Sequence, residues 1–77
     1  MINLTEKRFV DYFRNQAETG MGYWIATAYL KDGRIVPQVA VVGGHIEAVR
    51  NHEIVPFVEE DIHHFEVTHD KWDWRAK

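Results

Sequence analysis

Five histidines are the first residues to consider for chemistry, because imidazole binds metal ions and titrates near neutral pH. They are His45, His52, His63, His64 and His69. The densest cluster is His63, His64, His69 and Asp70, in which His63 and His69 would share one face of a strand. Adjacent His63 and His64 would point to opposite faces, and the chain has no HExxH or His-x-His spacing. We therefore predict no metal ligand and no cofactor, with surface or interface histidines; a His-based metal-binding module is the alternative.

Nucleophilic catalysis lacks its usual residues in this chain. There is no cysteine and no serine, so the two commonest nucleophiles are missing. The run Glu59-Glu60-Asp61 could serve as an acid–base group, but three carboxylates between strands are typical of a solvated turn. The glycines form no phosphate-binding loop, because Gly20-Met21-Gly22 precedes a strand pattern and not a helix. We predict that the protein is not an enzyme.

One helix is predicted near the start of the chain, over residues 5–18. Phe9, Phe13 and Ala17 recur every four residues and would form its apolar stripe. Thr5 is a suitable N-cap, and Gly20 can adopt the left-handed conformation that follows a helix. The helix would cover one side of whatever follows it.

Strand patterns fill the rest of the chain. The segments GYWIATAYLK, RIVPQVAVV, HIEAVRN, EIVPFV and IHHFEVTHD are short, rich in β-branched and aromatic residues, and separated by turns such as Asp32-Gly33 and Gly43-Gly44. Pro37 and Pro56 would lie at an edge or a bulge, because proline cannot donate to a ladder. We predict one domain, residues 1–77, that is mostly β with one N-terminal α-helix. Its five antiparallel strands, residues 22–69, would form a small barrel, followed by a tail over residues 70–77.

The charge balance restricts the partners. Nine Lys and Arg residues stand against twelve Asp and Glu residues, giving a formal charge of -3. Binding to nucleic acid through phosphate neutralisation needs a basic surplus, so DNA is not expected as a partner. No stretch is apolar and long enough for a signal peptide or a bilayer span. We expect a cytoplasmic protein without a membrane partner.

Self-association is predicted from the aromatic content. Three Trp, three Tyr and four Phe exceed what a barrel of 77 residues encloses, and an unpaired edge strand would also favour association. We predict a homo-oligomer joined by strand addition, with Val41 and Val58 in the interface. A monomer with its aromatics packed under the helix is the alternative.

The order of elements resembles the Sm-like family, the small SH3-like barrels that include the bacterial RNA-chaperone rings. The resemblance runs from about residue 5 to residue 67 and rests on the helix TEKRFVDYFRNQ, the hairpin AYLKDGRIVPQV and the ending VPFVEEDIHHFEV. It implies an N-terminal helix, five strongly bent strands, a ring of subunits and single-stranded RNA as a partner.

The sequence departs from this family at its RNA pocket. The family has an aspartate and an asparagine after its second strand, where this chain reads Gly43-Gly44-His45-Ile46. Where the bacterial rings have a Lys-His pair, this chain has Glu59 and Glu60, whose carboxylates would repel phosphate. The candidate ligand or RNA contacts are His45, Arg50, Asn51, Glu59 and Glu60. The first hypothesis is a homo-oligomeric Sm-like barrel that binds RNA; the alternative is an adaptor that acts through protein contacts alone.

Overall fold

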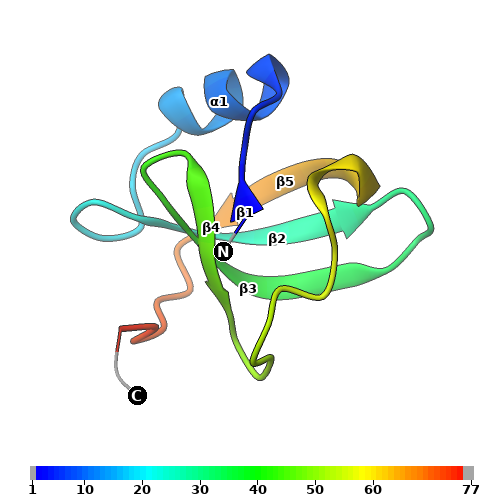
Figure 1. Cartoon of the computed structure of the whole chain (residues 1–77). Helices are drawn as coiled ribbons and strands as arrows, with labels where there is room; N and C mark the ends of the chain where they lie inside the picture. Colours follow the sequence, from blue (N-terminus) through cyan, green and yellow to red (C-terminus); the bar gives the residue numbers. More distant parts are fainter. Residues whose placement is uncertain (1, 76–77) are drawn as a thin grey trace.

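Five antiparallel strands curl into a half-barrel, and one helix lies against its inner side (Figure 1). This computed structural model describes residues 2–75. Along the chain the elements are β1 (Ile2–Asn3), α1 (Lys7–Arg14), β2 (Trp24–Leu30), β3 (Ile35–Val42), β4 (His45–Val49), the 3-10 turn η1 (Glu59–Asp61) and β5 (Ile62–Thr68). The strand order in the sheet is β1-β4-β3-β2-β5. The prediction of a mostly β chain with one N-terminal helix is confirmed.

The identity of one strand differs from the prediction. Residues 53–58 form no strand; the fifth strand is β1, which pairs with β4 through Ile2 and Ile46. Pro56 cannot donate to a ladder, and its carbonyl accepts a hydrogen bond from Arg34 Nη1 instead. Phe57 is buried and fixes this loop to the core. The predicted tail is described as far as residue 75; residues 76–77, like Met1, lie outside the described residues.

The helix is shorter than predicted at both ends. It begins after Glu6, whose side chain makes no capping hydrogen bond, so the assignment of Thr5 as N-cap is wrong. At the other end, Asn15 donates from Nδ2 to the carbonyl of Asp11 and ends the helix before Gly20. The residues between the helix and β2 form a loop that includes the buried Thr19.

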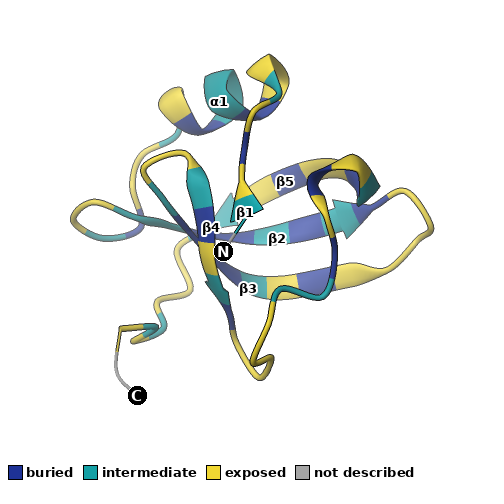
Figure 2. Cartoon of the chain, viewed as in Figure 1, coloured by how far each residue is buried: buried dark blue, intermediate teal, exposed yellow. Residues whose placement is uncertain are grey.

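The core lies between α1 and the inner face of the sheet, where Figure 2 shows the buried segments facing each other. Phe9 and Phe13 of the helix pack on Phe65 of β5, with ring centroids 5.2 and 5.0 Å apart. Phe13 also packs on Trp24 at 5.4 Å. The apolar stripe predicted for the helix is therefore confirmed at Phe9 and Phe13, which are buried, whereas Ala17 is exposed.

Bulges give the sheet its curl. Between β2 and β3 the pairing moves from Ala26↔Val39 to Ala28↔Val36, so Pro37 and Gln38 lie opposite a single residue. Gln38 has a φ of 57°, a left-handed conformation. The prediction that Pro37 belongs at an edge or a bulge is confirmed, since a bulge both tolerates proline and bends the strand.

Candidate functional site

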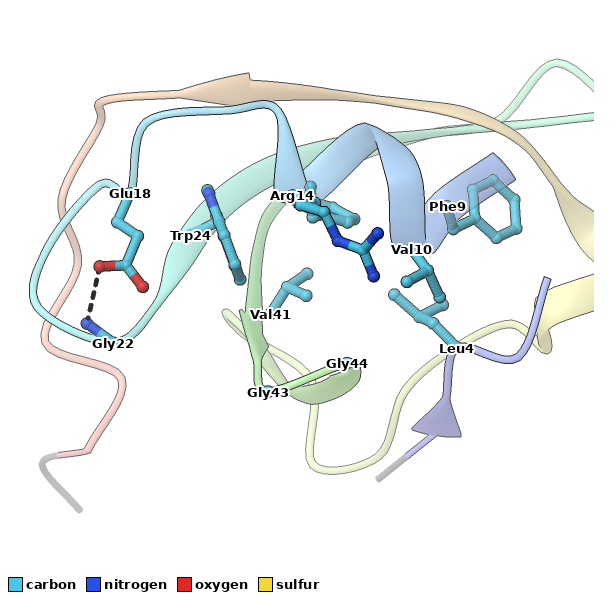
Figure 3. A pocket seen from close by; sticks show the side chains of 11 residues that line it. Leu4, Phe9, Val10, Arg14, Glu18, Gly22, Trp24, Val41, Gly43 and Gly44 are labelled. Carbon is cyan, nitrogen blue, oxygen red and sulfur yellow. Dashed lines mark hydrogen bonds between the residues drawn. The ribbon is translucent and has the colours of Figure 1, made fainter. Parts of the chain in front are cut away.

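An apolar groove of about 370 Å³ runs between α1, β2 and the turn that joins β3 to β4 (Figure 3). We call it the helix–sheet groove. Its apolar lining comes from Leu4, Phe9, Val10, Phe13, Trp24 and Val41, its glycines are Gly22, Gly43 and Gly44, and its charged residues are Arg14 and Glu18. An apolar lining with a few charged groups at its margin is the composition of a binding surface for apolar side chains.

Two features of the sequence shape the walls of this groove. The Trp24 indole N–H donates to the carbonyl of Gln16 at 3.0 Å, which fixes the ring at the groove wall. Gly43 and Gly44 form a tight turn with φ values of 53° and 85°. Residues that carry a side chain adopt such positive φ values only with strain. A Cβ at either glycine would meet open space, so side chains there would extend into solvent beside the groove.

The charged margin of the groove carries both signs. Arg14 extends from the helix between Trp24 and Val10, and its only described carboxylate neighbour within ion-pair distance is Asp11, 3.9 Å away. Glu18 lies at the far end, where its carboxylate accepts a hydrogen bond of 3.3 Å from the Gly22 N–H. The residue before Gly22 is Met21, which is 92% exposed. An exposed apolar side chain is thus the chain neighbour of a groove residue, whereas most of the groove's apolar lining (Leu4, Phe9, Phe13 and Val41) is buried.

Glu59 has a structural role that the sequence did not indicate. Its carboxylate accepts hydrogen bonds from the Thr5 N–H (2.7 Å), the Thr5 hydroxyl (2.7 Å) and the Glu6 N–H (2.9 Å). Burial opposes ionisation of Glu59, but these donors and the nearby Arg8 charge outweigh it and lower its pKa. We call this contact the Glu59 cap, because it satisfies N–H groups at the start of α1 from 54 residues away. A carboxylate engaged in this way does not face a ligand.

The edges of the sheet are covered in part, since β1 pairs with only His45 and Ile46 of the five-residue β4. Along β5, Arg8 donates to the carbonyls of Ile62 and His63, and the Tyr12 hydroxyl accepts from the Val67 N–H at 2.9 Å. The opposite edge strand, β1, has two residues. Covered and very short edges are the usual protection against strand addition.

The interface residues predicted from the sequence lie in different environments. Val41 is 0% exposed and belongs to the core, so it contributes to the helix–sheet groove only as a fully buried lining residue and not as an edge-strand contact. Val58, just before η1, is 54% exposed. A charge at Val41 would therefore test the core and not an interface.

The predicted ligand contacts fall into two groups. His45 lies on β4 with its Nε2 2.6 Å from Glu47 Oε2, while Arg50 and Asn51 occupy the turn after β4, where Asn51 has a φ of 69°. Glu59 and Glu60 are on η1, and Glu60 is exposed. Within residues 2–75, no hydrogen bond or ion pair joins the first group to the second.

His63 and His64 lie side by side, so the prediction that they point to opposite faces is wrong. Tyr29 pairs with His64 and Leu30 with Ile62, which leaves His63 as the extra residue of a β-bulge. The bulge breaks the two-residue alternation of the strand. Across the described part of the chain, no group of three or more His, Cys, Asp or Glu side chains is arranged to hold a metal.

An aromatic patch forms where the tail meets the start of β2. The rings of Tyr23 and Trp74 pack at 5.6 Å, and the Arg75 guanidinium lies 4.5 Å from the Trp74 ring. Lys71 and Trp72 line the same hollow. We call these five residues the tail patch.

Three of the remaining described cations are paired, whereas no ion pair is described for Lys31 or Arg50. Lys7 is 2.5 Å from Asp11, Arg8 is 2.9 Å from Glu6, and Arg34 is 2.8 Å from Asp32. Pairs of this kind reduce the net attraction for phosphate on these surfaces.

Within residues 2–75, no helix is both long enough and apolar enough to cross a membrane. Comparison with protein-family models, curated proteins and solved structures gave no match.

Proposed function

We propose that this protein is an assembly module: a small-barrel subunit that pairs with a second copy of itself through the helix–sheet groove. The observation that carries the proposal is the placement of Met21, 92% exposed, next to Gly22 at the margin of the groove. Methionine is unbranched and adapts to irregular apolar surfaces. When a protruding side chain and a groove lie on the same face of a subunit, a two-fold axis lets the side chain of each copy fill the groove of the other.

The charged margin supports the same pairing. Arg14 and Glu18 both line the groove, one on the helix and one in the loop before β2. A two-fold axis that passes between Arg14 and Glu18 would bring Arg14 of each copy to Glu18 of the other and make the charges complementary between copies. A stable contact of standard size buries about 800 Å² per subunit, about a sixth of the 4938 Å² exposed by this chain. Met21 alone is too small for this, so the outer surfaces of α1 and the Gly43-Gly44 turn also contribute.

The groove is favoured over strand addition as the site of assembly. Arg8 and Tyr12 engage the outer backbone groups of β5, and β1 presents two residues. The resemblance to the Sm-like family supports a small-barrel subunit that works in an assembly, and we propose such a subunit here. In place of a ring joined by strand addition, we propose contacts through the helix–sheet groove.

The experiment is sedimentation velocity on the whole chain and on two matched variants. Met21→Asp places a charge at the proposed contact, whereas Ile54→Asp places one at a residue that is 80% exposed and does not line the groove. We expect Met21→Asp to weaken self-association at least tenfold, and Ile54→Asp to leave it unchanged. Equal association of the wild type and Met21→Asp, or a wild type that stays monomeric at high concentration, would refute the proposal.

Single-stranded RNA is a second candidate, supported by the tail patch. Three aromatic residues and two cations form this patch, with Asp73 also in its lining, and aromatic rings beside cations are the side chains on which nucleotide bases stack without sequence preference. Binding of a uridine-rich oligonucleotide at about 50 mM salt, lost in Trp74→Ala and retained in Met21→Asp, is the expected result. No binding at that salt concentration, or binding that survives Trp74→Ala, would count against this candidate.

A further inference from the structure

The bulge in β5 places two imidazoles at one point on the outer surface of the sheet. His63 and His64 lie opposite a single position of β2, and their Nδ1 atoms are 2.7 Å apart. Both side chains are exposed, so water and solutes reach them. In a regular strand the same two residues would point to opposite faces. The bulge therefore creates a pair of nitrogen ligands that alternation would forbid.

The separation of the two nitrogens indicates which ion they suit. With metal–nitrogen bonds of about 2.0 Å, ligands at right angles are about 2.8 Å apart, and tetrahedral ligands about 3.3 Å. The observed 2.7 Å is the length of a hydrogen bond between the two rings, and it is also close to the right-angle separation. Cu²⁺ prefers square-planar or tetragonal nitrogen sites and binds more tightly than Ni²⁺ or Zn²⁺ to a given ligand set. We propose that His63 and His64 form a surface site for Cu²⁺, in which water completes the coordination sphere.

The neighbours of His64 would orient and support a bound cation. Its ring stacks on Tyr29 at 4.5 Å with an interplanar angle of 1°, which fixes the plane of the imidazole. Its other nitrogen, Nε2, lies 3.9 Å from Glu66 Oε2. The common supporting arrangement is a carboxylate hydrogen-bonded to the second nitrogen of a metal-bound histidine, and Glu66 is within ion-pair but not hydrogen-bond distance of that nitrogen. The Tyr29 hydroxyl donates to the other Glu66 oxygen at 2.9 Å and holds that carboxylate in place.

The guanidinium that contacts the backbone of this bulge is already engaged. Arg8 donates to the carbonyls of Ile62 and His63, and its Nε is 2.9 Å from Glu6 Oε1. Its repulsion of a cation is reduced by that carboxylate. Metal binding also requires that both Nδ1 atoms present lone pairs, so the proton shared between them moves to an Nε2 atom. On His64, that proton faces Glu66.

The test is titration of the whole chain with Cu²⁺ and, separately, Zn²⁺ in a buffer that does not coordinate metals. Binding is followed by calorimetry and by the electron paramagnetic resonance spectrum of Cu²⁺. We expect one nitrogen-ligated Cu²⁺ site that loses at least tenfold in affinity in His63→Asn and in His64→Asn. The matched control His52→Asn removes an exposed imidazole elsewhere and should bind as the wild type does. Glu66→Gln should weaken binding about tenfold.

Several outcomes would overturn this assignment. They are absence of a Cu²⁺ site, equal affinity in the wild type and His63→Asn, or Zn²⁺ binding as tight as Cu²⁺ binding. Because the His63 and His64 side chains are exposed, their Asn variants should keep the far-ultraviolet circular dichroism of the wild type, so a loss of affinity reports on ligation. The outcome is independent of self-association, since neither histidine lines the helix–sheet groove.

Discussion

Replacing the buried Glu59 with glutamine should cost more stability than any other single charge removal on η1. The carboxylate accepts three hydrogen bonds from Thr5 and Glu6. Glutamine keeps one acceptor oxygen and replaces the other with an amide group that cannot accept. One hydrogen bond to a charged group contributes about 1.5–3 kcal/mol, so we expect Glu59→Gln to lower the free energy of unfolding by about 2 kcal/mol. For a domain of this size the corresponding fall in Tm is about 8–16 °C.

The assay is urea unfolding followed by circular dichroism, with Glu60→Gln as the matched control. Glu60 is the next residue, is exposed, and makes no described side-chain hydrogen bond. Its substitution should change the free energy of unfolding by about 0.5 kcal/mol or less. Equal unfolding midpoints for the two variants would refute the account of the Glu59 cap.

The same contact predicts a pH dependence. The pKa of Glu59 is lowered from 4.5 in the folded chain, so the unfolded state takes up its proton more readily on acidification. The stabilisation is present above about pH 4.5 and is lost as the pH falls through the lower, folded-state pKa. The difference in stability between wild type and Glu59→Gln should therefore shrink below about pH 4. A constant difference from pH 7 to pH 3 would contradict this explanation.

Three further substitutions test other parts of the fold. Val41→Lys buries an unpaired charge at a position that is 0% exposed and should unfold the chain, whereas Val58→Lys should leave its circular dichroism unchanged; a folded Val41→Lys would contradict the placement of the core. Tyr12→Phe removes the hydroxyl that accepts a hydrogen bond from the Val67 N–H. This substitution should lower the free energy of unfolding by about 1 kcal/mol and speed hydrogen exchange at Val67. Unchanged exchange would show that this edge is not covered as described. Arg8→Ala frees the carbonyls of Ile62 and His63 and should increase aggregation in a light-scattering assay, unlike Lys7→Ala, whose partner is Asp11 on the same helix.

The local parts of the fold could be predicted from the sequence. The apolar spacing of Phe9 and Phe13 identified the helix and the face that it buries. The turns at Asp32-Gly33 and Gly43-Gly44 separated β2, β3 and β4 at the expected places. These features depend on neighbours along the chain, where propensity and periodicity are informative.

Features that depend on distant residues could not be predicted. Glu59 caps a helix 54 residues away, and nothing near it in the sequence distinguishes it from the exposed Glu60. The strand β1 is too short to show a two-residue alternation. The pairing of His63 with His64 arises from the register of β5 against β2, and a bulge of this kind leaves no local pattern. Met21 was visible as an apolar residue between glycines, but its position beside a groove follows only from the packing of α1.

The most direct test of the central proposal is the native mass of the whole chain, measured by light scattering over a range of concentrations. The proposal predicts a concentration-dependent rise from the 9.1 kDa subunit toward twice that mass, with Met21→Asp remaining at the subunit mass. A wild-type mass that stays at 9.1 kDa at every concentration would contradict assembly through the helix–sheet groove.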